Sequence, residues 1–110
     1  MKIFFVVATI ATAVSFSFAA LAEKPSYQIT VKDHQFSPSE VKVPAGEKFK
    51  LTVNNLDPSP EEFDSSDLGR EKVVPGKTAA TILLGPLKPG TYRFVGEFNQ
   101  KTAQGKIIAE

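Results

Sequence analysis

Residues 49–67 read F-K-L-T-V-N-N-L-D-P-S-P-E-E-F-D-S-S-D, and this stretch decides how the chain is organised. Apolar and polar side chains alternate over its first five residues, with Phe49, Leu51 and Val53 on one side. This period of two predicts a strand with one buried and one solvated face. The remainder is acidic, and we expect it to form a loop that is stiffened by its two prolines and anchored by a buried Phe63.

Two interpretations of the acidic remainder are open. Its five carboxylates are those of Asp57, Glu61, Glu62, Asp64 and Asp67, and no Lys or Arg lies among them. Clustered like charges raise one another's pKa, so such clusters usually have a reason. The simpler interpretation is a solvated acidic loop. The other is an oxygen-rich site for a hard or intermediate metal ion, because such ions prefer carboxylate ligands.

Short segments of strand character, separated by Gly and Pro turns, flank this stretch on both sides. The predicted strands are 27–31, 40–43, 49–53, 71–74, 78–84, 91–95 and 105–109. Helical periodicity is absent, apart from one predicted helical turn at 65–69. Six to eight short strands in one small domain are typical of a β-sandwich, so we predict an all-β fold. The strand at 78–84 carries no charge, which favours a central position in its sheet.

The single histidine, His34, lies where the pattern of the first strand breaks. Ile29 and Val31 are odd-numbered, whereas the next apolar residue is Phe36. A strand cannot change phase without an extra residue, so we predict a bulge or bend at residues 33–35.

The beginning of the chain predicts export. A lysine at position 2 is followed by an uncharged apolar run at 3–18 and by A-L-A at 20–22. This order is typical of a secretory signal peptide, here residues 1–22. The apolar run is short for a membrane span and has no basic stop-transfer flank. We therefore expect one exported domain, residues 23–110, located in the periplasm and not inserted in the membrane after cleavage.

Composition excludes several classes of function. The 13 Lys and Arg residues, one of them Lys2, balance the 12 Asp and Glu residues, which argues against nucleic acid or an anionic membrane surface as the partner. The chain has no Cys, so its stability must come from its core rather than from disulfides. No catalytic triad, phosphate-binding loop or zinc-finger spacing is present, and hydrolase or transferase functions have no support.

Five motifs resemble those of the cupredoxins in their order and spacing. They are I-T-V-K-D-H-Q-F-S-P (29–38), V-K-V-P-A-G (41–46), L-T-V-N-N-L-D (51–57), L-K-P-G-T-Y-R-F (87–94) and G-K-I-I (105–108). The resemblance implies a Greek-key β-sandwich. The segments P-E-E-F-D-S-S-D-L, E-K-V-V-P-G, G-E-F-N and T-A-Q-G are similar to those of small periplasmic cupredoxin-like proteins found with Ftr-type and Efe-type bacterial iron uptake. That similarity implies a role in handling iron, together with copper, and an iron permease as a partner.

The departures from blue-copper cupredoxins concern all four metal ligands. By correspondence, the first His ligand falls at Glu61 and the Cys ligand at Gly96. The second His falls near Asn99, and the Met falls at Ala103 or Gln104. A type 1 copper site needs a thiolate, which this chain cannot supply. The sequence therefore predicts no electron transfer through blue copper.

A different ligand set remains at the same end of the predicted sandwich. The resemblance places Glu61 and Glu62 in the loop of the first ligand, brings His34 close, and puts Glu97 after the former Cys position. Carboxylates with one imidazole suit Fe, Mn, Cu(II) or Zn. Parity argues against Glu97, which shares the face opposite Phe94 unless the strand has ended by then.

These residues predict a periplasmic metal-binding protein that assists iron uptake by binding Fe or Cu(II). The sequence leaves open whether the protein also aids the oxidation of Fe(II). The alternative is a metal-free β-sandwich module that docks on a transporter or another periplasmic partner. Under that alternative the acidic residues are a solvated surface.

Overall fold

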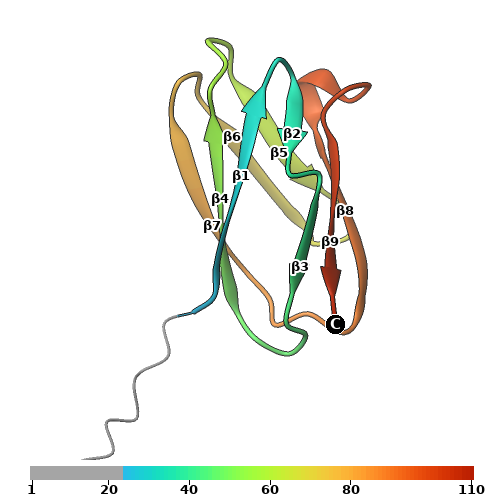
Figure 1. Ribbon diagram of the computed structural model, residues 1–110. Coiled ribbons are helices and arrows are strands. Elements are labelled where there is room, and N and C mark those ends of the chain that lie inside the picture. The colour runs from blue at the N-terminus through green and yellow to red at the C-terminus, as the bar shows by residue number, and fades with distance from the viewer. Residues whose placement is uncertain (1–23) are drawn as a thin grey trace, which may run out of the picture.

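Two β-sheets face each other in the computed structural model, which describes residues 24–110 (Figure 1). The strands are β1 (Ser26–Lys32), β2 (Gln35–Ser37), β3 (Glu40–Val43), β4 (Phe49–Asn55), β5 (Glu61–Ser65), β6 (Arg70–Val74), β7 (Ala79–Leu84), β8 (Gly90–Gly96) and β9 (Gln104–Ala109), with the 3-10 turn η1 (Glu97–Asn99) after β8. One sheet has the order β2-β1-β4-β7 and the other the order β3-β9-β8-β5-β6. The predicted all-β sandwich is confirmed.

The predicted signal peptide, residues 1–22, lies outside the described residues. Within residues 24–110, no helix is long and apolar enough to cross a membrane.

The strand connections cross between the sheets, as in a Greek key. β1 pairs with β4 in parallel, with Ile29 opposite Val53, and β3 pairs with β9 in parallel, with Val41 opposite Ile107. The remaining pairs are antiparallel. Parallel neighbours cannot be joined by a tight hairpin, so each parallel pair brings together segments that are distant in sequence.

The core lies between the sheets and is built on three buried phenylalanines. Phe49, Phe63 and Phe94 are at most 1% exposed. The Phe94 ring meets the Phe36 ring edge-on, with centroids 5.1 Å apart, and lies 5.0 Å from the Phe63 ring. Each of these residues comes from the apolar phase of an alternating strand, which is how the sequence pattern produces the core.

The bulge or bend predicted at residues 33–35 is a hairpin turn at Asp33 and His34. Asp33 and His34 both have positive φ, 52° and 58°, and they join β1 to the antiparallel β2. Two-residue turns of this hand match the twist of the flanking strands. The apolar phase changes because the chain reverses direction here, and the prediction of an extra residue within one strand was wrong.

Asp57, which lies in the segment that follows β4, is hydrogen-bonded to this turn. Its carboxylate accepts hydrogen bonds from the backbone N–H groups of Asp33 (2.8 Å) and His34 (3.0 Å). The backbone N–H of Asp57 itself donates to the side chain of Asn55 at 3.0 Å. Asp57 is therefore a buried structural group that ties the segment after β4 to the β1–β2 hairpin.

We expect acid to weaken the fold through Asp57. The hydrogen bond from the His34 amide, assisted by that from Asp33, lowers the pKa of Asp57 even though burial acts to raise it. A carboxyl whose pKa is lower in the folded state stabilises the fold above its unfolded pKa and loses this contribution as the pH falls through its folded pKa. Urea unfolding from pH 7 down to pH 2 should therefore show a smaller loss of stability in Asp57→Asn than in wild type. Parallel curves would contradict this assignment.

Three further expectations differ from the structure. The acidic segment was expected to be a loop, but residues 61–65 form β5, which pairs with β6 along its whole length. The segment at 66–69 is a hydrogen-bonded turn rather than a helical one, and the Gly69 N–H donates to the Ser66 carbonyl. The strand predicted as central, β7, lies at the edge of its sheet.

Candidate functional site

The strand β5 divides the acidic side chains between two faces. Glu61, Phe63 and Ser65 are buried between the sheets, whereas Glu62 and Asp64 point to the outer face. Successive side chains of a strand point to opposite faces, so the buried Phe63 fixes the direction of both glutamates. The two glutamates that were expected to act together therefore lie on opposite sides of the sheet.

Glu61 is a buried carboxylate, 2% exposed, whose oxygens are taken by neighbouring donors. Its Oε1 accepts hydrogen bonds from the backbone N–H groups of Glu62 and Phe98, both at 3.0 Å. Its Oε2 accepts a 2.7 Å hydrogen bond from Nδ2 of Asn99. Two of these donors belong to η1, so Glu61 fastens the segment that leaves β8 onto the start of β5.

The positions that correspond to cupredoxin metal ligands meet around this carboxylate. A Cβ atom added to Gly96 would lie 2.6 Å from Glu61 Cδ and 2.6 Å from Ala103 Cβ. The backbone N–H of Gly96 donates to the Ala103 carbonyl at 2.9 Å, and Asn99 bonds Glu61. Glu61, Gly96, Asn99 and Ala103 thus surround one point at the η1 end of the sandwich.

A second group of carboxylates lies on the outer face at the same end. The pKa of Glu97 is raised, and the main cause is hydrogen bonding with the neighbouring Asp64 carboxyl. Loss of hydration and the negative charges of Asp64, Glu62 and Glu71 raise it further. We call Glu62, Asp64, Glu71 and Glu97 the outer acidic cluster.

The outer acidic cluster follows from strand register. Asp64 lies opposite Glu71 in β6 and opposite Val95 in β8, and the β8 register ends at Phe63 opposite Gly96. Glu97 is the next residue, so it emerges beside the outward side chains of β5. Among residues 24–110 the ion pairs lie elsewhere, between Lys42 and Glu110 and between Lys106 and Glu40. These carboxylates therefore lack a Lys or Arg partner in the described part of the chain.

His34 is exposed on the β1–β2 turn, and its backbone N–H is bound to Asp57. The four predicted ligands do not converge: Glu61 is inside, Glu62 and Glu97 are outside, and His34 is on a hairpin turn. Across residues 24–110, no three His, Asp or Glu side chains are arranged as metal ligands.

Sequence reasoning named Asp64 only as one carboxylate of the acidic segment and missed its position beside Glu97. The available signal was parity, because Asp64 is two residues from Glu62 and hence on the same face of a strand.

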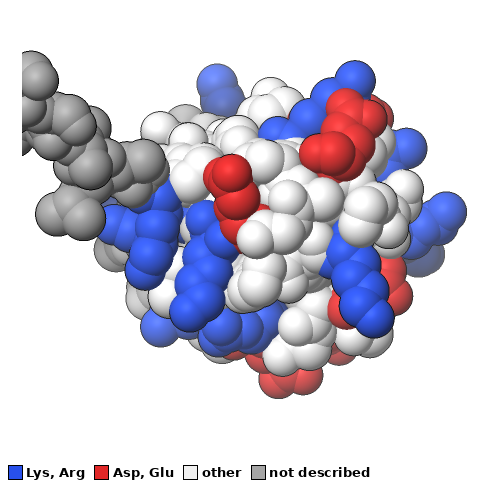
Figure 2. All heavy atoms as spheres, turned by 90° about the horizontal axis from the view of Figure 1, so that it is seen from below, with Lys and Arg blue, Asp and Glu red and all other residues white. Residues whose placement is uncertain are grey.

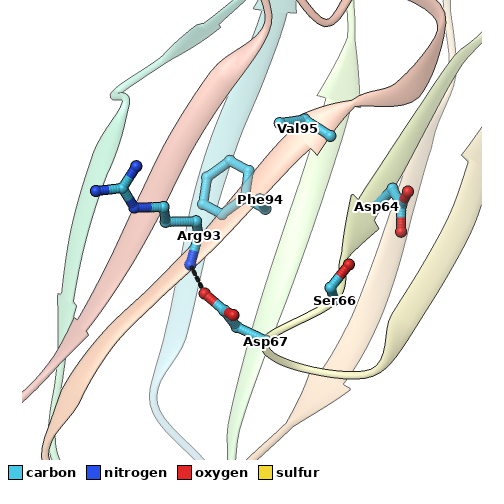
Figure 3. A pocket seen from close by; sticks show the side chains of 6 residues that line it. All are labelled: Asp64, Ser66, Asp67, Arg93, Phe94 and Val95. Carbon is cyan, nitrogen blue, oxygen red and sulfur yellow. Dashed lines mark hydrogen bonds between the residues drawn. The ribbon is translucent and has the colours of Figure 1, made fainter.

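A shallow hollow of about 200 Å³ adjoins the outer acidic cluster, where β5 and β8 separate (Figure 3). Asp67 accepts a 2.8 Å hydrogen bond from the backbone N–H of Arg93, and Ser65 Oγ donates to the Arg93 carbonyl at 2.6 Å. These two side-chain hydrogen bonds hold the end of β5 and the segment after it against β8, where the backbone pairing between β5 and β8 has ended. Asp67 therefore serves as the hydrogen-bond acceptor for a backbone N–H of β8.

The opposite end of the sandwich has a different charge. In Figure 2, which views the molecule from below relative to Figure 1, Lys and Arg side chains spread over much of the face, and Asp and Glu form smaller groups. This end carries the turns after β3 and β7, joined by a 2.9 Å hydrogen bond from the Gly46 N–H to the Leu87 carbonyl. The outer acidic cluster is thus separated from these cations by the length of the strands.

Comparison with known proteins agrees with this architecture. The sequence profile of the cupredoxin-like domain matches residues 4–109, almost the entire chain. The chain belongs to the cupredoxin-like domain family. A protein of Rickettsia prowazekii (strain Madrid E), described as uncharacterized, is 51% identical over 81 residues, which cover 74% of this chain and 65% of that protein. The present chain thus spans about 65% of the length of this relative.

Several solved structures share the cupredoxin-like fold at low sequence identity. The Cu(I)-bound metal-binding domain of the Streptococcus pneumoniae exporter CopA is 16% identical, with a TM-score of 0.69 over 77% of this chain and 84% of that one. A copper-binding protein in its apo form is 20% identical, with a TM-score of 0.68 over 77% and 86%. Auracyanin A of Chloroflexus aurantiacus, a blue copper protein, is 13% identical, with a TM-score of 0.67 over 77% and 98%. At these identities the likeness concerns the fold.

A blue-copper centre does not fit this cupredoxin-like chain. The chain has no Cys, and at the corresponding Gly96 any side chain would collide with Glu61 and Ala103. The Glu61 carboxylate fills the space between β5, Gly96 and Asn99 and accepts three hydrogen bonds there. The ligand positions of blue copper are occupied by a hydrogen-bonded network that holds the same segments together.

Proposed function

We propose that this cupredoxin-like protein is exported to the periplasm, where it binds iron or Cu(II) ions and serves iron uptake. The cation would bind at the outer acidic cluster, with Glu62, Asp64 and Glu97 as ligands. One observation carries the proposal: the Asp64, Glu62 and Glu71 carboxylates lie near enough to Glu97 to raise its pKa, and the ion pairs among residues 24–110 lie elsewhere. A cation bound among these carboxylates would offset their mutual repulsion.

Carboxylate oxygens are ligands suited to hard and intermediate metal ions. The Asp64 side chain comes from the rigid β5, and Glu97 starts η1, which Glu61 fastens to the same strand. Glu62 shares the outer face with Asp64 and is near enough to raise the pKa of Glu97. Rotation of these partly exposed side chains would bring three carboxylates onto one ion.

The proposed ligand set keeps two of the four residues predicted from sequence and adds Asp64. Glu61 takes a positioning role, because its oxygens already accept three hydrogen bonds in the interior. His34 is on the turn between β1 and β2, where its backbone serves the Asp57 contact.

The connection with iron uptake and an iron permease rests on the resemblance of the segments around β5, β6 and η1 to those of iron-uptake cupredoxin-like proteins. Export rests on the signal-peptide pattern of residues 1–22. The copper-binding proteins that share the fold support metal binding as a general role. Binding and delivery of the ion account for these features without a redox step in this chain.

The test is a metal titration of the exported chain by calorimetry, with Fe(II) under anaerobic conditions and with Cu(II). Glu97→Gln should weaken binding by at least about tenfold, because it removes a charged ligand. Affinity in wild type should fall as the solution is acidified, because bound protons compete with the cation. The matched control is Glu40→Gln, which removes one exposed carboxylate from β3, far along the sheet order.

Saturable binding that Glu97→Gln weakens and Glu40→Gln leaves unchanged supports the proposal. Absence of saturable binding at neutral pH would favour the second candidate, a metal-free module that docks on a transporter or periplasmic partner. The observation in favour of that candidate is the network of Glu61, whose two carboxylate oxygens are taken by the backbone N–H of Phe98 and the side chain of Asn99.

A further inference from the structure

The four sheet edges of the sandwich differ in how they are protected from pairing with other strands. β2 has only three residues, β3 has four and carries Glu40 and Lys42, and β6 carries three charges in the run R-E-K. Short length and charge are the usual protections of an edge. β7 has six residues, A-A-T-I-L-L, and residues 78–87 contain no charge. Among the described strands, β7 is therefore the edge that lacks both protections.

The phase of β7 shows which backbone groups face away from β4. The Asn55 N–H donates to the Thr78 carbonyl at 2.8 Å, and the register continues with Val53 opposite Ala80 and Leu51 opposite Ile82. In an antiparallel pair, every second residue bonds its partner, so Thr78, Ala80 and Ile82 point toward β4. The N–H and C=O groups of the intervening residues, Ala79, Thr81 and Leu83, point to the open side.

Arg70 confirms this phase from the open side. Its guanidinium reaches from β6 and donates a 2.6 Å hydrogen bond to the Leu83 carbonyl. The Leu83 side chain, 41% exposed, lies on the outer face with Thr81, whose hydroxyl bonds that of Thr52 at 2.9 Å. Arg70 thus caps one carbonyl of a strand edge on which the backbone groups of three residues point outward.

We propose that the open edge of β7 is a dimerisation site, at which two copies of this chain pair their β7 strands antiparallel around a two-fold axis at Thr81. This register sets Thr81 opposite the partner subunit's Thr81, and Ala79 opposite the partner subunit's Leu83. A small side chain then faces a large one on each side of the axis. The result is a continuous eight-stranded sheet made of two four-stranded ones.

Charge favours a second copy as the occupant. The strand is complementary to itself, because it brings no charge to the pairing and an isologous contact needs a self-complementary surface. Arg70 of the other sheet reaches the edge at the Leu83 carbonyl and must turn away before two edges pair. Within the strands of the β7 sheet itself, the nearest cation is Lys50, which lies on β4 opposite Leu83. The two Lys50 residues of a dimer would be three strand spacings apart, at least about 14 Å. That exceeds the Debye length of about 8 Å at physiological ionic strength, so their repulsion is screened.

Sedimentation equilibrium of the exported chain, from micromolar to millimolar concentration, tests the proposal. Wild type should form a dimer. Thr81→Pro removes two N–H groups from the paired edge, one in each subunit, and none from the β4 ladder. It should raise the dimer Kd by about tenfold or more. Thr81→Ala loses the same contact with Thr52 but keeps the N–H, and it should change Kd by less than about threefold.

Two further variants address this edge in opposite directions. Leu83→Lys places a charge on the edge and should abolish the dimer even where Thr81→Pro fails to fold. Arg70→Ala removes the competing cap from the Leu83 carbonyl and should lower Kd. A monomer at millimolar concentration in both wild type and Arg70→Ala would overturn the proposal. So would a dimer that Leu83→Lys does not weaken, because its interface would then lie elsewhere.

Discussion

Phe94→Ala is expected to lower the free energy of unfolding by about 3 to 5 kcal/mol, because it opens a cavity in the centre of the core. Phe94 is 1% exposed and packs between the rings of Phe36 and Phe63, which belong to the two different sheets. Its ring also lies 2.4 Å from the position that a Cβ on Gly105 would take, so the strand β9 passes directly against it. The loss should be measured by urea unfolding followed by circular dichroism.

Phe98→Ala is the matched control for this prediction. Phe98 carries the same side chain but is 51% exposed on η1, and it is the backbone N–H of Phe98 that donates a hydrogen bond to Glu61. Its replacement should change stability by about 0.5 kcal/mol or less. Equal effects of the two substitutions would mean that the Phe94 ring is not the centre of the core.

Glu61→Ala is expected to cost about 3 kcal/mol or more, because it leaves three hydrogen-bond donors without their acceptor in a buried place. Glu61→Gln should cost less, since Asn99 can turn its amide and accept a hydrogen bond from the new NH2 group. Urea unfolding measures the stability. Hydrogen exchange of the Phe98 backbone N–H, which should become faster in Glu61→Ala, reports on the fastening of η1 itself.

Glu62→Ala is the control, because Glu62 is the next residue of the same strand but points to the outer face. It should leave both stability and the Phe98 exchange rate nearly unchanged. A Glu61→Ala variant with wild-type stability and wild-type exchange at Phe98 would show that the carboxylate does not hold η1. The comparison also separates Glu61 from the proposed ligands, since Glu61→Gln should retain cation binding that Glu97→Gln weakens.

The sandwich could be predicted because its strands repeat apolar residues with a period of two between Gly and Pro turns. Phe49, Leu51 and Val53 are buried as predicted, and so is Phe94. Such alternation determines the core face of a strand without knowledge of its neighbours. The motifs of the cupredoxins added the connection order, which local patterns do not contain.

The arrangement of the site was not predictable to the same degree. The carboxylates at 61, 62 and 64 were treated as a loop because two prolines precede them, yet pairing with β6 makes them a strand. Alternation then sends Glu61 inward, where its partners Phe98 and Asn99 lie 37 and 38 residues further along the chain. Pairings over such separations depend on the register of whole strands.

The position of β7 was mispredicted for a related reason. Absence of charge favours a central strand, because a central strand has a neighbour on each side and is more often buried on both faces. The structure shows that Ile82 and Leu84 face the core, while the neighbouring Leu83 is exposed on the outer face of an edge strand. The local sequence does not distinguish a strand that has a neighbouring strand on each side from a strand at the edge of a sheet.

The parallel pairing of β3 with β9 has a consequence for how the chain folds. Among residues 24–110, the strand partner of residues 40–43 is the distant segment 106–109. The larger sheet therefore cannot be completed until β9 is available, and closing so long a loop is a slow step. A nascent chain of this topology therefore stays incompletely folded until residues 104–109 have been made, and β3 remains an unpaired edge up to that moment.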